Sequence, residues 1–334
     1  MKNNDQIKVS VTFIAYKHAK YLQQCLDSVL CQKVNFKYEI IIADDASNDG
    51  SAEILRHYQD KYPDIIKPII HEENLGSRKN GASITPFVRG KYIAGGESDD
   101  FWTDEYRLQK QVDFLDSHPD YIAVGSNFYN VEPDGSHPYI SMLRWQVNRT
   151  YTLKDFKRLG MVIHGNSMLR RNYAVDRTDP RWVKLWSAGN TMGDVISRCL
   201  LYDRGKIFVM PDVMHAHRKG AQDKTSFFVA NQQKAIELSY MYCIIVDAIN
   251  EYFDGRHDVS ILKANRTGGI MLQSLMGHSK LDKKEFRAYM KTLPWNIRLW
   301  SYERCVQKLL RGIGHRIGRK LNLFYKLDDG AKQG

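Results

Sequence analysis

Apolar and polar positions along the first hundred residues form two alternating kinds of segment. Short runs that are rich in β-branched residues and apolar throughout are followed by longer segments whose apolar residues recur at helical spacing. The pattern predicts strands at 9–15, 39–43, 65–70 and 91–94, with helices at 20–32 and 51–62. Strands separated by helix-length segments indicate βαβ units and a mostly parallel sheet with helices on both faces.

Beyond residue 100 the alternation is less regular. Strands are expected at 121–128, 161–169 and 206–210, and helices at 108–115 and 193–202. From Phe227 onward, Ala, Leu and charged residues dominate and no strand pattern is found, which predicts a helical region. We therefore expect an α/β domain over residues 1–222, with halves at 1–104 and 105–222, followed by a helical appendage over 223–334.

The composition is that of a globular protein with a sizeable core, since 43% of the 334 residues are hydrophobic and 26% are charged. The net charge of +11 attracts phosphate-bearing partners without choosing between nucleotides, nucleic acid and anionic lipid. Five cysteines without a CxxC pair disfavour a disulfide framework or a zinc site and favour a reducing compartment. With no apolar signal segment or membrane-length apolar run, we expect a cytoplasmic location, with attachment to the inner membrane face as an alternative.

Two adjacent carboxylates, Asp44 and Asp45, follow the second predicted strand directly. Ligands of a doubly wound sheet bind at the carboxyl ends of its strands, so acids in this position are candidates for ligand contacts. The polar residues that follow suit a turn and a helix N-cap, which explains Asp49 or Ser51. A turn does not explain two neighbouring acids, which repel each other. We therefore favour a binding role for the pair over a turn alone.

A second acidic segment, with Glu97, Asp99 and Asp100, follows the fourth predicted strand behind a pair of glycines. On an extended segment, Glu97 and Asp99 project to the same side. Hard divalent cations bind one or two such carboxylates, and phosphate oxygens and water complete the shell. The sequence predicts a Mn2+ or Mg2+ site here. The alternative is a solvated acidic loop.

Four segments, in this order and spacing, resemble the bacterial, non-processive family 2 glycosyltransferases of the GT-A fold. They are the opening strand Val9–Tyr16, the acidic segment Asp44–Asp49, the loop Asn74–Asn80 and the segment Gly90–Trp102. The second matches the family's Asp-Asp-x-Ser-x-Asp, and the last resembles its Asp-x-Asp metal motif with Glu97 in place of the first Asp. Because this replacement lengthens the carboxylate, Asp99 is the firmer metal ligand. The resemblance covers residues 7–220 and implies a Rossmann-like, mostly parallel sheet flanked by helices.

The resemblance also implies a metal-dependent, inverting transfer of one sugar from a nucleoside diphosphate sugar to an acceptor hydroxyl. UDP-sugars are favoured as donors, and the expected acceptor is a glycan or lipid-linked glycan of a bacterial surface polysaccharide. Carried over position by position, the nucleotide-sugar contacts are Ala15, Tyr16, Asp44, Asp45, Asn74, Gly76, Arg78, Ser98 and Arg218. The implied metal ligands are Glu97, Asp99 and Asp100, and weaker acceptor contacts are Trp102, His164 and Asn166.

The catalytic base is expected at the start of the helix predicted at 193–202. Relatives carry an acid there in a Glu-Asp or Gly-Asp pair, and Gly193 and Asp194 match this pattern. Asp194 is therefore the candidate base, and the alternative is that it only interacts with the positive end of the helix. His215 and His217 lie on one side of an extended segment, where both a structural role and metal contact remain open.

The segment 295–326 is basic and carries apolar residues at helical spacing. It fits either a helix packed on the catalytic domain or an interfacial helix on an anionic membrane, anchored by Trp295, Trp300 and Phe324. No nucleic-acid partner is expected, because basic and aromatic residues are not interleaved on one surface. A catalytically inactive nucleotide-sugar-binding protein is the alternative to an enzyme, and Glu97 is its main support.

Overall fold

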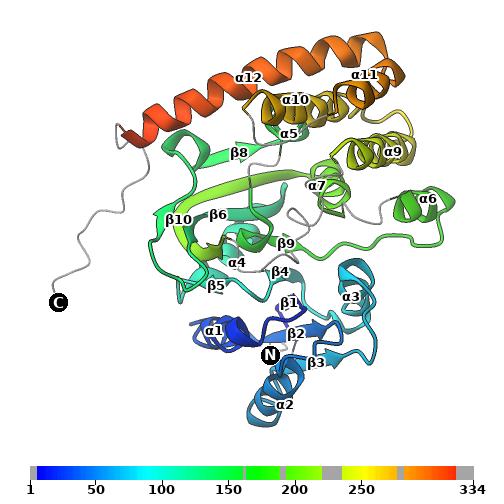
Figure 1. Ribbon diagram of the computed structural model, residues 1–334. Coiled ribbons are helices and arrows are strands. Elements are labelled where there is room, and N and C mark those ends of the chain that lie inside the picture. Colours follow the sequence, from blue (N-terminus) through cyan, green and yellow to red (C-terminus); the bar gives the residue numbers. More distant parts are fainter. Residues whose placement is uncertain (1–5, 161–162, 189–192, 220–234, 277–281, 321–334) are drawn as a thin grey trace.

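The computed structural model describes residues 6–160, 163–188, 193–219, 235–276 and 282–320 (Figure 1). Its strands form a ten-stranded sheet in the order β3-β2-β1-β4-β9-β6-β10-β5, with β7 paired to β6 and β8 to β10. The first four neighbours run parallel, and β9 lies antiparallel to both β4 and β6. The sheet is therefore mixed but mostly parallel, and the expected α/β class with flanking helices is confirmed.

The nucleotide half of the chain follows the predicted alternation closely. Its elements are β1 (Val9–Ala15), α1 (Ala19–Leu30), β2 (Tyr38–Asp44), α2 (Ser51–Lys61), β3 (Ile66–Ile70), α3 (Ser77–Ser83) and β4 (Tyr92–Glu97). Ile40, Ile41 and Ile42 of β2 are fully buried, as expected for a strand covered on both faces. Leu26 and Val29 of α1 fill the same core as β1, so the amphipathic pattern determines which side of the helix meets the sheet.

The second half adds shorter elements and two long strands. They are β5 (Phe101–Trp102), α4 (Arg107–Ser117), β6 (Tyr121–Val131), β7 (Tyr139–Ile140), β8 (Arg149–Tyr151), α5 (Leu153–Leu159), β9 (Leu169–Arg171), α6 (Pro180–Ala188), α7 (Gly193–Arg204) and β10 (Lys206–Arg218). The strand predicted at 206–210 continues to Arg218 because Val213, Met214 and Ala216 are also buried, and β10 stays paired with β6 through register shifts.

The strand predicted at 161–169 is wrong. Residues 161–162 lie outside the described residues, a single 3-10 turn covers Gly165–Ser167, and β9 begins only at Leu169. The reason is local. Asn166 and Ser167 are buried polar residues, and Ser167 turns back to give its hydroxyl proton to the carbonyl of His164, which a straight strand does not allow.

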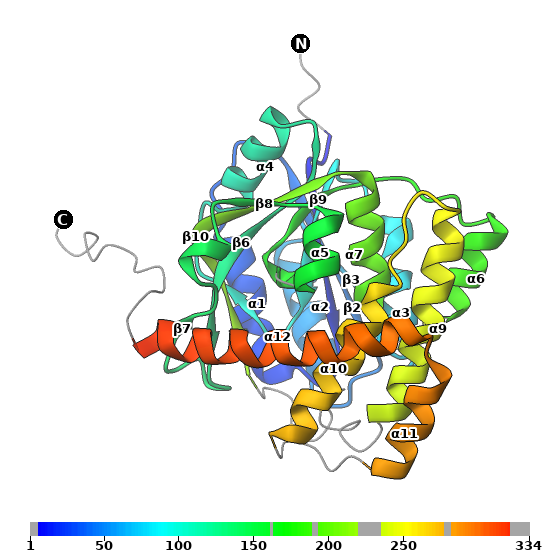
Figure 2. The same cartoon turned by 90° about the horizontal axis from the view of Figure 1, so that it is seen from above.

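The described residues after Phe227 are helical, as predicted, and form α9 (Ala235–Phe253), α10 (Ile261–Leu275), α11 (Lys283–Thr292) and α12 (Trp295–Lys320). Figure 1 shows these helices on the side of the molecule away from β3, and Figure 2 shows α12 running across α10. α9 shares the hydrophobic cluster of β6, β10 and α7 through Ile245, Ile249 and Phe253. This packing does not test the predicted domain boundary at 222/223, which stays a prediction. Among the described residues, no helix has the length and apolarity that crossing a bilayer requires.

Candidate active site

The carboxyl ends of three neighbouring strands bring the predicted acidic segments to one edge of the sheet. β1 lies between β2 and β4, and its last residues pair with Asp44 on one side and Glu97 on the other. Neighbouring strands are ~4.8 Å apart, so the ends of β2 and β4 are separated by roughly 10 Å. Residues from these two ends are thus close enough to contact the same small ligand.

The carboxylates of Asp44 and Asp45 are buried and fully engaged in hydrogen bonds. Asp44 accepts from the backbone N–H and the hydroxyl of Ser47, at 3.0 and 2.6 Å. Asp45 accepts from the backbone N–H groups of Leu75 and Gly76, at 2.7 and 3.0 Å. The pair therefore shapes the turn after β2 and anchors the loop 74–76 against it. Binding of a nucleoside by either carboxylate stays a prediction.

The remaining nucleotide-sugar candidates of this half border the same edge. Ala15 ends β1 in the core, while the side chain of Tyr16 and the loop residues Asn74 and Gly76 are exposed. The hydroxyl of Ser98 is buried and lies 2.9 Å from Nδ1 of His18. Burial lowers the pKa of His18 to about 4, so the ring is neutral at pH 7.

The glycine pair before the acidic segment allows a close approach between β4 and the turn at 165–167. A Cβ on Gly96 would lie 1.6 Å from Oδ1 of Asn166. Gly95 has a φ of +141°, which favours glycine, and a Cβ there would lie 1.7 Å from the carbonyl oxygen of Thr12. Only glycine at position 96 lets the amide of Asn166 reach the end of β4.

Glu97 and Asp99 form the reactive part of the acidic segment. Burial, followed by the charges of Asp100 and Glu97, raises the pKa of Asp99 to about 7, and its Oδ1 has no hydrogen-bond partner among the described residues. The pKa of Glu97 is also raised, first by loss of solvent around its carboxylate and then by the charges of Asp100 and Asp194. Oδ1 of the buried Asp99 lacks a donor that would stabilise its charge, and a bound cation relieves this condition.

Asp100, in contrast, is held by neighbours on three sides. Its oxygens accept from the side-chain amide of Asn166 and the backbone N–H of Arg218, and they lie 3.3 Å from Nδ1 of His217. Burial opposes a charge on His217, but the hydrogen bond to Asp100 and the nearby carboxylates outweigh it and raise the pKa of the ring. Asp100 is thus the structural centre of the acidic segment.

Three histidines surround this carboxylate. Nε2 of His215 lies 3.2 Å from Nδ1 of His164, and the ring of His164 also lies 4.5 Å from that of His217, centroid to centroid. Ligand atoms of Asp100, His164 and His215 lie within 4.8 Å of one another. His215 is fully buried, its Nδ1 has no partner among the described residues, and burial holds its pKa well below the usual range. The two histidines of β10 do lie on one side, as expected, and they face His164.

Arg218, Arg78 and Trp102 each pack against aromatic or cationic side chains, and their predicted ligand contacts stay predictions. Arg218 is buried between the rings of Tyr21 and Phe101 and donates to the carbonyl oxygen of Asp99. The guanidinium of Arg78 stacks 3.9 Å above the ring of Trp186. Trp102 is buried beneath the guanidinium of Arg107, at 4.0 Å, which disfavours an acceptor contact.

Asp194 lies exposed in the first turn of α7, and its charge contributes to the raised pKa of Glu97. The start of α7 is therefore close enough to the acidic segment for the charge of Asp194 to act on Glu97. One turn later, the buried Arg198 donates to the carbonyl oxygen of Ile163 at 3.1 Å and thereby connects the helix to the turn that carries His164. Together these contacts bring Asp194, Glu97 and His164 to one region.

His18, Arg107 and Arg198 also contact residues of the site, and no motif in the sequence predicts these contacts. Arg107 is fully buried and donates to the carbonyl oxygen of Asn166. Its only sequence signal is an arginine directly before the helix predicted at 108–115, next to Leu108. Such a residue has to find an acceptor inside the protein.

A divalent cation fits this donor set. The orphaned buried oxygen of Asp99 and the raised pKa values of Asp99 and Glu97 show uncompensated negative charge. Carboxylate oxygens suit Mg2+ and Mn2+. A second possible ligand set joins Asp100 with His164 and His215.

The mostly parallel sheet with its flanking helices defines a class of fold, the GT-A type. The chain belongs to Glycosyl transferase family 2, whose sequence profile matches residues 10–177, half of the chain. The expected enzyme class, glycosyltransferase, is confirmed at this level.

Relatives and solved structures agree with the family. The chain is 36% identical over 126 residues to the putative glycosyltransferase EpsE of Bacillus subtilis, covering 37% of this chain and 44% of that protein. It is 30% identical over 182 residues to the minor teichoic acid biosynthesis protein GgaA of the same organism, covering 53% and 40%. The crystal structure of S. aureus TarS 1-349 in complex with UDP-GlcNAc has a TM-score of 0.59 at 16% identity, covering 87% of this chain and 83% of that one. The chain spans about a third of the length of the first curated relatives, which are uncharacterized Mycobacterium proteins.

Proposed function

We propose that this chain transfers one sugar from a nucleoside diphosphate sugar to an acceptor hydroxyl with inversion at the anomeric carbon. The observation that carries the proposal is the pairing of an under-compensated carboxylate cluster, Glu97 and Asp99, with Asp194 at the start of the facing helix. A cation bound to such a cluster attracts a diphosphate, and a carboxylate on the opposite element is available for proton transfer.

In this mechanism Asp194 accepts the proton of the acceptor hydroxyl. The acceptor oxygen attacks the anomeric carbon, and the bond from that carbon to the diphosphate oxygen breaks, so negative charge passes to the departing nucleoside diphosphate. Glu97 and Asp99 would hold a Mn2+ or Mg2+ ion, while Asp100 keeps their loop in place through Asn166. When bound, such an ion would supply Lewis-acid stabilisation of the leaving diphosphate.

UDP-sugars are the proposed donors, and a bacterial surface polysaccharide intermediate, a glycan or lipid-linked glycan, is the proposed acceptor. Two similarities support this proposal: TarS is a structural neighbour solved with UDP-GlcNAc, and the relative GgaA is named for minor teichoic acid biosynthesis. A panel of nucleotide sugars, each with and without Mn2+, tests the donor through thermal stabilisation, since a ligand that binds the native state raises its melting temperature. We expect the largest metal-dependent rise with a UDP-sugar. A panel in which no nucleotide sugar raises the melting temperature contradicts the proposal.

A catalytically inactive nucleotide-sugar-binding protein is the second candidate, because Glu97 replaces the first Asp of the metal motif. Hydrolysis of the stabilising nucleotide sugar with added Mn2+ separates the two candidates. Slow release of nucleoside diphosphate that depends on Mn2+ supports the enzyme. Stabilisation without any release, in the wild type and in a Glu97→Asp variant alike, supports the inactive binder.

Peripheral attachment at the cytoplasmic membrane face is also part of the proposal. One face of α12 packs on α10 through Ile297, Ser301 and Cys305, which are buried. The opposite face carries large apolar side chains that are about half exposed or more: Trp295, Leu299, Tyr302, Val306, Leu310 and Ile313. We call these six residues the apolar stripe. An apolar stripe on a basic helix is typical of interfacial helices on anionic lipid.

Flotation of the full chain with vesicles tests this attachment. Val306→Glu and Leu310→Glu place charges in the apolar stripe without touching the face that packs on α10. We expect both variants to lose flotation with vesicles that contain phosphatidylglycerol, with Gln307→Glu as a control beside the stripe. Equal flotation of all three variants and the wild type contradicts the role of the stripe.

A further inference from the structure

Arg198 of α7 is a buried arginine whose described hydrogen-bond partners are all uncharged. Its Nη2 donates to the carbonyl oxygen of Ile163 at 3.1 Å, and its Nη1 contacts the sulfur of Met168. Among the described residues, no carboxylate forms an ion pair or a hydrogen bond with this guanidinium. A buried charge without such a partner costs free energy, so stability alone does not explain an arginine at this position.

Asp194 lies four residues before Arg198, so the two side chains share one face of α7. An acid in this position ordinarily forms an ion pair with the arginine one turn later. In the part of the chain that the structure describes, the carboxylate of Asp194 forms neither an ion pair nor a hydrogen bond. Burial lowers the pKa of Arg198, and Tyr202 and then Asp194 oppose this shift, so the two charges lie within electrostatic reach. The bond to Ile163 therefore directs the guanidinium into the protein and away from an ion pair with Asp194.

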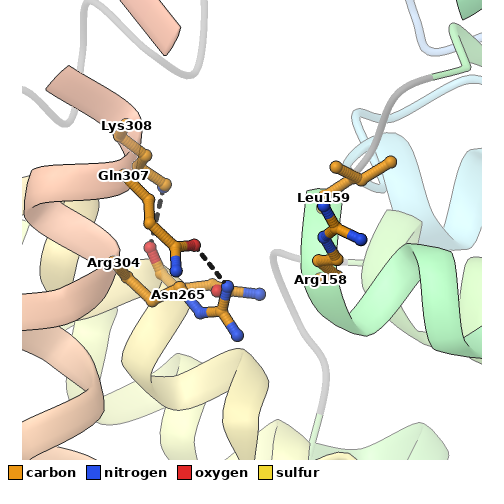
Figure 3. Close-up of a pocket in the computed structure, with 7 residues that line it drawn as sticks. Arg158, Leu159, Asn265, Arg304, Gln307 and Lys308 are labelled. Atoms are coloured by element: carbon orange, nitrogen blue, oxygen red, sulfur yellow. Dashed lines mark hydrogen bonds between the residues drawn. The ribbon is translucent and has the colours of Figure 1, made fainter. Parts of the chain in front are cut away.

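The turn that Arg198 contacts takes its position from two helices. Upstream of this turn, the end of α5 is not closely packed against α12, because a pocket lies between them (Figure 3). From α4, Arg107 donates to the carbonyl oxygen of Asn166. From α7, Arg198 donates to that of Ile163. Arg198 is thus the direct hydrogen-bonded link between the turn and the helix that begins with Asp194.

We infer that Arg198 is a positioning residue for Asp194. By binding Ile163, it fixes the first turn of α7 against the turn that carries His164, and it leaves the carboxylate of Asp194 outside an ion pair. The inference rests on the proposed function, in which Asp194 accepts the proton of the acceptor hydroxyl. A reacting group that is misplaced by about 1 Å loses roughly 10²-fold in rate, so the placement of this helix matters for turnover.

The test compares Arg198→Met with Arg204→Met in the full chain. Arg204 is a matched control, because it lies on the same helix and also donates to a backbone carbonyl oxygen, that of Leu200 at 3.0 Å. The assay measures UDP release with Mn2+ from UDP-glucose, UDP-galactose and UDP-GlcNAc, each taken separately. We expect Arg198→Met to lower kcat by about 10–10²-fold, with the KM for the donor little changed. Arg204→Met should stay within about twofold of the wild type, as for a site without coupling to the base.

A double-mutant cycle with Asp194→Asn shows whether Arg198 acts through the base. In the Asp194→Asn background the base is already lost, so Arg198→Met should change the residual turnover by about twofold or less. Arg198→Lys keeps the charge and one donor for Ile163, and its kcat should lie between those of the wild type and Arg198→Met. Melting temperatures show whether each variant folds. If Arg198→Met does not fold, the same cycle with Arg198→Lys decides.

The outcomes separate this inference from the proposed function. Equal kcat values of Arg198→Met and Arg204→Met overturn it, and so does the same loss in both backgrounds, which indicates a structural role alone. A raised donor KM with unchanged kcat overturns it in favour of donor binding. In each of these cases, loss of UDP release in Asp194→Asn leaves the proposed function standing. No release by the wild type, or wild-type release by Asp194→Asn, contradicts the proposed function and the inference with it.

Discussion

Two groups of carboxylates lie at the same edge of the sheet, and they differ in what surrounds them. Asp44 and Asp45 are buried, and both oxygens of each carboxylate accept hydrogen bonds from backbone or hydroxyl donors. Asp99 is equally buried, yet one of its oxygens has no partner among the described residues and its pKa is raised to about 7. Similar sequence signals, adjacent acids after a strand, thus have two different physical meanings.

The difference separates acids that shape the protein from acids that are kept for a ligand. A carboxylate that accepts several hydrogen bonds is stabilised in its charged form and fixes the loop that provides the donors. A carboxylate that is buried among other acids without donors is costly to the folded protein unless a cation compensates. We therefore expect substitutions in the first group to affect stability and substitutions in the second group to affect activity.

The largest effect is expected at Asp194, whose charge acts on Glu97 of the acidic segment that contains Asp99. Asp194→Asn removes the proton acceptor, and a general base contributes ~10²–10⁴-fold to the rate. We expect kcat to fall by that factor while the nucleotide sugar still raises the melting temperature as in the wild type. Glu237→Gln is a matched control, since Glu237 is also an exposed acid in the first turn of a helix. Turnover of Asp194→Asn close to that of the wild type removes Asp194 from this role.

The same amide substitution in the two groups tests the comparison directly. In Asp45→Asn, the side-chain amide N–H lies against a backbone N–H donor, that of Leu75 or of Gly76. One charge-assisted hydrogen bond is therefore lost. We expect its free energy of unfolding in urea to fall by about 3 kcal/mol. Asp99→Asn removes a charge from a crowded acidic segment, so without metal its stability is expected to stay equal or rise while Mn2+-dependent activity is lost. A larger loss of stability in Asp99→Asn than in Asp45→Asn reverses the assignment.

The elements of the nucleotide half were predictable because each strand carries its own apolar pattern and each acidic segment directly follows one. The support of the site was not, because it depends on residues far apart in the chain. His18 contacts Ser98 across 80 positions, and Arg218 reaches Asp99 across 119. Neither contact leaves a local pattern. The segment 161–169 is apolar at both ends, which predicts a strand, whereas the polar contacts of Asn166 between those ends decide the conformation.

In the absence of metal, the pH dependence of stability is expected to differ between the wild type and Asp99→Asn. The pKa of Asp99 is raised from 3.8 to about 7 in the folded protein, so the folded state binds this proton more tightly than the unfolded chain. The stabilisation is complete below about pH 4 and is lost as the pH rises through 7. With EDTA present, the wild-type melting temperature should fall across this window relative to that of Asp99→Asn. Added Mn2+ should remove the difference, because a bound cation stabilises the charged form; parallel curves in EDTA contradict the assignment.

The smallest effect concerns the hydrogen bond from Asn166 to Asp100, which distinguishes Asp100 from Asp99. Gly96 allows Asn166 to reach Asp100, and a Cβ at position 96 would overlap the amide oxygen of Asn166. Gly96→Ala is therefore expected to cost about 1–3 kcal/mol of stability, as for other overpacked sites. In an Asn166→Ala background the obstructing amide is absent, so the added methyl group should cost less.

A double-mutant cycle of these two substitutions measures that difference, with an expected coupling of about 1–2 kcal/mol. Gly205→Ala is the comparison, because its Cβ would meet the backbone of Asp120 and Ile122 at 3.1–3.2 Å, away from Asn166, so it should cost the same in both backgrounds. If Gly96→Ala is also additive with Asn166→Ala, the glycine serves the backbone of β4 and not the amide contact. If only Gly96→Ala is coupled to Asn166→Ala, the absence of a side chain at position 96 is what lets Asn166 bind Asp100. Asp99 is then the carboxylate that stays available for the cation.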